Sequence, residues 1–166
     1  MKTKRLLSLF VCVVVVMTMV LGTTTAFAAS GSKKVTSTGS MSVILKEGQS
    51  GESSSVSFRV SGLPANAKVT KIVVNPGTLG NGSGAIVSTS LKLVSSATKT
   101  QDKIPWGGQP NREITSNAFI NTPANATYTI SFNSTCYGGA ISNGMMLDIG
   151  TKIYKNPNIT VYWSEM

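Results

Sequence analysis

Few side chains in this sequence could do chemistry, and histidine is absent. Without an imidazole, a Ser-His-Asp triad, a Cys-His pair and every histidine-ligated metal site are excluded. Cys136 could act as a nucleophile only beside a lysine or a carboxylate. The better interpretation of Cys136 is a small buried hydrophobic side chain, with pairing between two chains as the alternative. We therefore expect no catalytic residue, no metal and no cofactor.

A hydrolase that uses two carboxylates is compatible with the composition, because it requires only a pair of Asp or Glu side chains. The six acidic residues are Glu47, Glu52, Asp102, Glu113, Asp148 and Glu165. Asp102 and Glu113 lie in one long connection and could approach each other, so they are the candidate pair. The simpler interpretation treats these carboxylates as solvated surface charges.

The stretch from Lys103 to Arg112, Lys-Ile-Pro-Trp-Gly-Gly-Gln-Pro-Asn-Arg, has the composition of a binding loop. Trp106, flanked by glycines and prolines, could present its ring to solvent, where flat aromatic faces bind sugars and anchor protein interfaces. Asn111 and Arg112 add hydrogen-bond donors. These three residues are the candidate ligand-binding site. The other interpretation, which we favour, is that Trp106 turns inward and fills one end of the fold.

Residues 1–28 have the pattern of a cleaved secretory signal peptide. Basic residues precede an apolar run from Leu6 to Leu21, and Ala26-Phe27-Ala28 places small residues at the positions that a signal peptidase reads. The apolar run is shorter than the ~18–20 residues that a membrane-spanning helix needs. We expect cleavage after Ala28, no transmembrane span afterwards, and a protein that is secreted or held at the cell surface.

The remaining chain is basic. Removing Lys2, Lys4 and Arg5 from the 15 basic residues leaves 12 against 6 acidic ones, a net charge of +6. Attraction to an anionic cell-wall polymer or an acidic glycan follows from this charge. Lysines that keep the protein soluble and blunt sheet edges explain it equally well. Nucleic acid is not expected, since the basic residues do not interleave with aromatic ones.

The segment from 29 onward is rich in Ser, Thr, Gly and Asn, which disfavours helices. Residues 127–133 alternate aromatic or β-branched residues with hydroxyl residues, the pattern of a strand with one buried face. In 85–95 the pattern places Val87, Leu91 and Leu93 on one face and Ser88, Ser90 and Lys92 on the other, with a bend near Thr89. Asn81-Gly82 predicts a tight reversal. The expected strands are 41–45, 55–60, 68–74, 85–95, 127–133, 145–149, 151–154 and 158–163, with a short element near 114–120.

These strands predict an all-β protein, an antiparallel β-sandwich with jelly-roll or Greek-key connections, over residues 41–166. Residues 29–40 are expected to form a flexible linker. A closed barrel is the alternative architecture.

Phe119-Ile-Asn-Thr-Pro-Ala-Asn-Ala-Thr-Tyr-Thr-Ile130 and the later Ile-Thr-Val-Tyr-Trp163 together resemble the C-terminal half of the P-type jelly-roll domains attached to convertases and subtilases. In that family a Phe precedes a Pro-Asn-Gly-Thr-Trp-Thr-Leu strand. Ala126 and Tyr128 stand where the family usually has Gly and Trp, and its calcium-binding acidic residues have no clear counterpart here. The resemblance implies a jelly-roll with an accessory role.

The leading hypothesis is a secreted, non-catalytic binding or structural module at the cell surface or envelope. Its expected partner is an anionic cell-wall polymer, a glycan or a surface protein, and its oligomeric state stays open. The alternatives are a carboxylate-dependent glycan hydrolase and a self-assembling or pore-forming exported protein.

Overall fold

The computed structural model describes residues 28–83, 85–138, 140–143, 145–147 and 149–166, so the expected signal segment, apart from Ala28, lies outside the described residues. The described part contains fourteen strands, and all of their pairings are antiparallel. In that part, no helix has the length and apolarity to cross a membrane. The strands are β1 Ser30–Thr36, β2 Ser40–Lys46, β3 Ser50–Glu52, β4 Val56–Val60, β5 Ala67–Asn75, β6 Thr78–Ser83, β7 Ile86–Ser95, β8 Gln101–Pro105, β9 Ile114–Ser116, β10 Ala126–Cys136, β11 Ala140–Ser142, β12 Met145–Leu147, β13 Ile149–Lys155 and β14 Asn158–Glu165.

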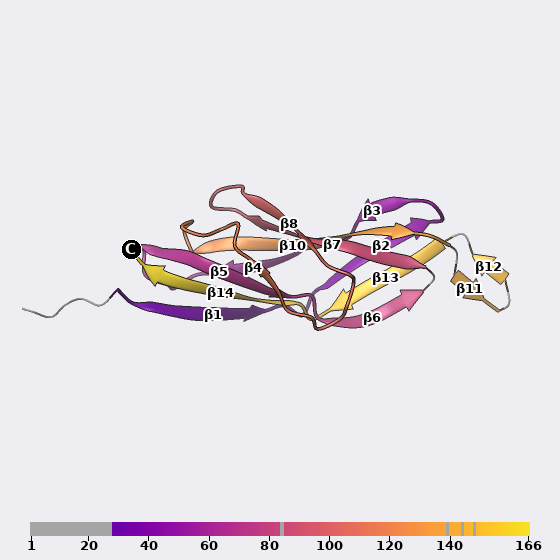
Figure 1. Cartoon of the computed structure of the whole chain (residues 1–166). Coiled ribbons are helices and arrows are strands. Elements are labelled where there is room, and N and C mark those ends of the chain that lie inside the picture. Colours follow the sequence, from indigo (N-terminus) through magenta and orange to yellow (C-terminus); the bar gives the residue numbers. More distant parts are fainter. Residues whose placement is uncertain (1–27, 84, 139, 144, 148) are drawn as a thin grey trace, which may run out of the picture.

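The fold is an antiparallel β-sandwich, as the alternation predicted. One layer is the sheet β3-β10-β7-β8, in which β4 also pairs with β10. The facing layer consists of two sheets placed end to end, β1-β14-β5-β9 and β2-β13-β6 (Figure 1). The aromatic rings of Phe132 on β10 and Tyr154 on β13 meet between the layers, with their centroids 5.2 Å apart. β11 and β12 form a separate hairpin beyond one end.

The second layer contains three long strands that are each interrupted at the same level. At this level β1 adjoins β2, β14 adjoins β13, and β5 adjoins β6. Hydrogen bonds hold the break together: the Ser37 N–H donates to the Pro157 carbonyl at 3.0 Å, and the Asn156 N–H donates to the Gly39 carbonyl at 3.2 Å. Gly77 has a φ of +85°, and a side chain there would collide with the Lys155 carbonyl. The break therefore requires a glycine at position 77.

The core contains the inward-facing residues that the alternation predicted. Tyr128, Ile130 and Phe132 of β10 are fully buried, and so are Ile159 and Val161 of β14. Trp163 packs against this core while part of its side chain stays exposed. At roughly 1.5–3 kcal/mol for each large apolar side chain, the central strands supply much of the hydrophobic stabilisation.

The expectation of a flexible linker over 29–40 is wrong, because Ser30–Thr36 forms β1 and pairs with β14 along its whole length. Val35 is the residue of β1 that packs against the core. Backbone hydrogen bonds to β14, rather than an alternating apolar pattern, hold this edge strand in place.

The bend expected near Thr89 is confirmed, and it changes which residues of β7 face inward. Asn133 pairs with Ser90 and Ser134 pairs with Ser88, so Thr89 is the extra residue of a β-bulge. The bulge shifts the alternation, which buries Ser88 and leaves Val87 47% exposed. The expectation that Val87 and Leu91 share a buried face is therefore wrong.

Four strands lie where the apolar pattern is weak. β3 and β8 were not expected, and β6 runs through Asn81-Gly82, where a reversal was predicted. Gly80 permits β6 to lie beside β13, because a Cβ at this position would come 2.6 Å from the Lys155 side chain. β9 lies within the region expected to hold a short element.

Cys136 is fully buried, and its thiol donates to the Gly138 carbonyl at 3.0 Å. It forms no disulfide within the described residues. The interpretation as a small buried hydrophobic residue is confirmed.

Candidate polar groove on the five-stranded sheet

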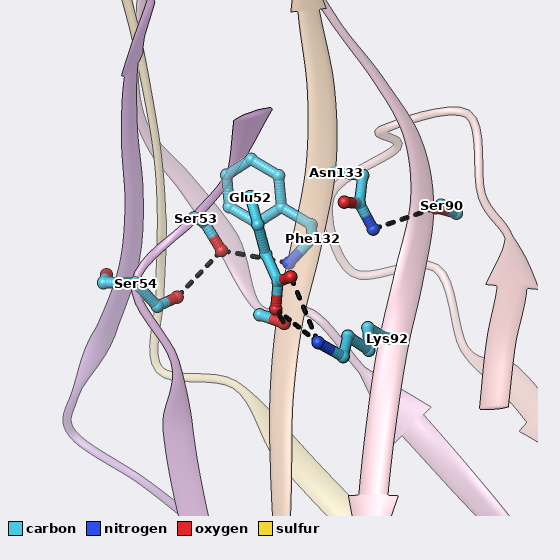
Figure 2. Close-up of polar contacts among 8 residues, drawn as sticks. Glu52, Ser53, Ser54, Ser90, Lys92, Phe132 and Asn133 are labelled. Atoms are coloured by element: carbon cyan, nitrogen blue, oxygen red, sulfur yellow. Dashed lines mark hydrogen bonds and ion pairs between the residues drawn. The ribbon is translucent and has the colours of Figure 1, made fainter. Parts of the chain in front are cut away.

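The outer face of the five-stranded sheet carries a polar groove made of two adjoining hollows, of about 380 and 210 Å³. The two hollows share Glu52, Lys103 and Asn133. Their remaining lining residues are Ser50, Gly51, Thr89, Ser134 and Thr135 in the larger hollow, and Lys92, Gln101 and Asp102 in the smaller. Figure 2 shows the side of this groove where β3, β10 and β7 meet.

The groove follows from the alternation of β10. Because Tyr128, Ile130 and Phe132 point into the core, the residues between and after them point outward. These outward residues carry hydroxyl or amide groups: Thr127, Thr129, Ser131, Asn133 and Thr135. Cross-strand hydroxyl pairs continue the polar surface, with Thr129 3.0 Å from Ser57 and Thr135 2.8 Å from Ser50.

Ser53 positions Glu52. Its Oγ accepts a hydrogen bond from the Phe132 N–H at 2.9 Å, and its own N–H donates to the Phe132 carbonyl at the same distance (Figure 2). These two bonds fill the gap between the stretches of β10 that pair with β4 and with β3. Glu52 is thereby fixed on the outer face beside β10.

The charged groups at this side of the groove pair with each other. The Lys92 ammonium lies 3.1 and 3.2 Å from the two Glu52 oxygens, and the Ser131 hydroxyl donates to Glu52 Oε1 at 2.5 Å (Figure 2). The Ser131 hydrogen bond, more than Lys92, lowers the pKa of Glu52 below its ordinary value of 4.5, against the opposing effect of burial. Glu52 is therefore ionised at neutral pH.

Asn133 lies at the middle of the groove. Its side-chain amide donates to the Ser90 hydroxyl at 3.3 Å (Figure 2). Its backbone carbonyl accepts a bond from the Thr89 hydroxyl at 3.3 Å. The β-bulge at Thr89 thus orients an amide group beside an ion pair. Amides and hydroxyls of this kind recognise polar, uncharged groups through paired donors and acceptors.

The two predicted carboxylates are not brought together in the groove. Asp102 lines the smaller hollow, and its Oδ2 accepts a hydrogen bond from the Ser116 hydroxyl at 2.6 Å, which links β8 to β9. Glu113 is exposed just before β9 and is not among the lining residues. The acidic residue that shares the groove with Asp102 is Glu52.

The structure places Trp106 in the core, which confirms the interpretation that its ring turns inward and overturns the candidate ligand-binding role that needs the ring in solvent. The residue is 2% exposed. Its ring centroid lies 4.8 Å from that of Tyr154 and 6.0 Å from that of Phe132, and its Nε1 donates to the Gln109 carbonyl at 3.0 Å. Burial of the indole with its N–H satisfied by the loop's own backbone removes it from any surface site.

Asn111 and Arg112 lie at the surface without the aromatic ring that was expected beside them. The backbone of Asn111 anchors its loop to the break in the second layer, because its N–H donates to the Gly77 carbonyl at 2.8 Å and its carbonyl accepts a bond from the Asn75 amide at 3.3 Å. Arg112 reaches the Gln109 side chain at 3.4 Å. The three predicted site residues therefore do not form one ligand-binding surface.

Apart from Asp102, the groove residues were not identified from the sequence, since they come from four strands. The signal that points to part of the groove is the run of outward hydroxyl and amide residues along β10. Glu52 and Lys103 belong to short strands that the apolar pattern does not reveal.

No family model and no curated protein matches the chain. Among solved structures, an inferred secreted protein from Eubacterium rectale is similar over 83% of this chain and 41% of its own, with 12% identity and a TM-score of 0.51. FlhE is similar over 82% of this chain and 98% of its own, with 16% identity and a TM-score of 0.47. A family 32 carbohydrate-binding module of C. perfringens NanJ, solved with galactose, covers 78% of this chain and 99% of its own, with 12% identity and a TM-score of 0.30. At these identities the similarity concerns the fold alone.

Proposed function

We propose that this chain is an exported, non-catalytic β-sandwich module that binds an uncharged glycan of the cell envelope in the polar groove. The observation that carries the proposal is the lining: hydroxyl and amide groups surround an ion pair, Glu52 with Lys92, whose charges cancel each other. Of the other two charged lining residues, Lys103 lies beside Lys92 on the outer face, whereas Asp102 pairs with the buried Leu93 and its carboxylate turns inward to Ser116. With its carboxylate neutralised by Lys92 and one further lysine among many hydroxyl and amide groups, the groove offers hydrogen bonds more than charge, which suits a ligand rich in hydroxyls.

The state of Glu52 supports a binding role over hydrolysis. A two-carboxylate hydrolase needs one carboxylic acid with a raised pKa that can protonate the leaving group. The pKa of Glu52 is instead lowered by its hydrogen bond from Ser131 and by Lys92. The residue that shares the groove with Asp102 is therefore unsuited to act as the acid.

The shape of the groove implies a weak and extended contact. The two hollows are open, and no aromatic residue lines them. Affinity would come from several hydrogen bonds made along a polymer, each contributing about 0.5–1.5 kcal/mol. We expect repeating oligosaccharides to bind more tightly than single sugars, as multivalent contact requires.

Retention of the purified protein on neutral envelope glycans tests the proposal. We expect retention at physiological ionic strength that persists in 0.5 M salt, because hydrogen bonds between neutral groups are little screened. The Asn133→Ala and Lys103→Ala variants should bind several-fold more weakly. Ser57→Ala serves as the matched control, since it removes a hydroxyl from the same face outside the lining.

Two results would contradict this function. One is the absence of retention on any neutral glycan together with a correctly folded protein. The other is glycan cleavage by the wild type that disappears in Asp102→Asn, which would establish the hydrolase alternative.

A further inference from the structure

A second groove, of about 400 Å³, lies on the outer face of the sheet β1-β14-β5-β9. Tyr162 of β14 is at its centre. The other lining residues are Trp163 and Ser164 of the same strand and the small residues Ser30, Gly31, Ser32 and Thr70 of the flanking strands. None of them belongs to the polar groove described above.

The register of the three strands explains why Tyr162 stands in a hollow. Ser32 of β1 and Lys71 of β5 lie directly opposite Tyr162 on its two sides. Ser30 and Ser164 form the adjacent cross-strand pair. An aromatic ring among serines leaves open space beside its face, which is the geometry that an apolar sugar face requires.

A β-bulge in β5 adds a further outward side chain to this surface. Tyr162 pairs with Lys71 and Trp163 pairs with Val69, so Thr70 is the extra residue. Thr70 and Lys71 are both exposed although they are consecutive, while Val69 and Ile72 on either side are buried. The bulge thus places a hydroxyl and an ammonium together next to the Tyr162 ring.

The charge of this face is unbalanced. The Lys71 ammonium lies 4.4 Å from the centroid of the Tyr162 ring. Lys68 is paired with Ser164, and Lys34 is paired with Thr160, so both are diagonal neighbours of Tyr162. Diagonal neighbours in a sheet are about 7–8 Å apart, within reach of a lysine side chain.

Acidic residues are absent from the outward positions of these strands within the described part of the chain. Those positions are Ser30, Ser32, Lys34, Thr36, Lys68, Thr70, Lys71, Val73, Asn75, Thr115, Asn158, Thr160, Tyr162 and Ser164. The nearby Glu165 follows the inward register, and its carboxylate accepts a hydrogen bond from the Ala29 N–H at 3.2 Å. The Lys92–Glu52 pair has no equivalent on this face.

We infer that this groove binds an acidic polysaccharide. One sugar ring lies against Tyr162. The carboxylate of that sugar forms an ion pair with the Lys71 ammonium, which leaves the face of the tyrosine ring. Lys34 and Lys68 meet the acidic groups of neighbouring sugars, and the serine hydroxyls bond to the sugar hydroxyls. The inference is independent of the proposed neutral-glycan site, because the two grooves lie on opposite faces of the sandwich and differ in charge.

The test uses polygalacturonate as the acidic probe and dextran as the neutral one, with binding measured on the purified protein at low and moderate salt. We expect binding of polygalacturonate that weakens about tenfold between 0.05 and 0.3 M salt, because exposed charges are screened over that range. Dextran should not bind at this groove. Lys71→Gln and Tyr162→Ser should each lower the affinity about tenfold.

Two variants separate this site from general attraction to a basic protein. Tyr162→Phe keeps the ring and should keep the binding. Lys103→Gln removes one positive charge from the opposite face and should leave polygalacturonate binding unchanged while weakening binding to neutral glycans. Equal losses in Lys103→Gln and Lys71→Gln would overturn the inference, as would undiminished binding by Tyr162→Ser or equal binding to phosphate-bearing lipid vesicles. Urea unfolding of each variant identifies losses that come from misfolding.

Discussion

At the scale of single residues, the exposure of two aromatic side chains is the reverse of what their positions in a loop and in a strand suggest. Trp106 lies in a loop of glycines and prolines and is almost completely buried, whereas Tyr162 lies in the middle of a strand and opens onto a groove. The difference arises from the residues around each ring: Trp106 fills the space beside Phe132 and Tyr154, while Ser32 and Lys71 lie opposite Tyr162 on the two neighbouring strands. Loop position alone does not indicate exposure.

Removal of the Trp106 side chain should destabilise the protein by about 3–5 kcal/mol, because it leaves a cavity against two aromatic rings. Arg112→Ala changes an exposed residue of the same loop. It should alter the free energy of unfolding by no more than about 0.5 kcal/mol. Urea unfolding measures the change in the free energy of unfolding for both variants. A small effect of Trp106→Ala would mean that the indole is not part of the core.

The stability contributed by Glu52 should depend on pH in a defined direction. Its pKa is lower in the folded protein than its ordinary value of 4.5, so the contribution is present above that value and is lost as the pH falls through the folded pKa. The difference in unfolding free energy between wild type and Glu52→Gln should therefore be largest near neutral pH and shrink below pH 4.5. A difference that grows on acidification would contradict this assignment.

At the scale of elements, the strands that the sequence predicts are those with one buried and one wet face. β2, β4, β10 and β14 show this alternation, and the structure confirms them. β1 was missed because an edge strand held by backbone hydrogen bonds needs few apolar residues. The groove was missed because its lining depends on the register between strands, and one β-bulge at Thr89 reverses which residues of β7 point outward.

A single methyl group added at the interruption shared by the three strands should lower the stability of the protein. Gly77 and Gly48 both have positive φ values, +85° and +76°, but only at Gly77 would a Cβ collide with backbone, whereas Gly48 has open space around it. Gly48→Ala should lower the free energy of unfolding by about 1–2 kcal/mol, because alanine is strained in the left-handed backbone conformation. Gly77→Ala should lower the free energy of unfolding by roughly 2–5 kcal/mol, because the collision of the Cβ with the backbone adds to the same conformational strain. Equal losses in urea unfolding would show that the break tolerates a side chain.

Signal cleavage at the expected position would create a contact between the two ends of the domain. Cleavage after Ala28 converts the Ala29 N–H, 3.2 Å from a Glu165 oxygen, into an ammonium group next to a carboxylate. Mass spectrometry of the exported product should find a chain that begins at Ala29. A product that retains residues 1–28 would disprove the predicted signal peptide.

At the scale of the whole molecule, the sandwich separates two surfaces of different charge. The five-stranded sheet presents a groove in which Glu52 is paired with Lys92, and the opposite sheet presents lysines around Tyr162. A net charge of +6 for the cleaved chain (12 − 6) therefore does not describe either surface by itself. Under the two proposals, neutral and acidic glycans bind at separate places on one domain.

The most direct test of the neutral-glycan site is a chemical-shift titration of the isotope-labelled protein with a neutral envelope oligosaccharide. We expect the perturbed amides to cluster at Gly51 and Glu52, at Lys92, at Lys103 and from Ser131 to Thr135. Perturbations confined to the Trp106–Arg112 loop, or the absence of perturbation at millimolar ligand, would contradict this expectation.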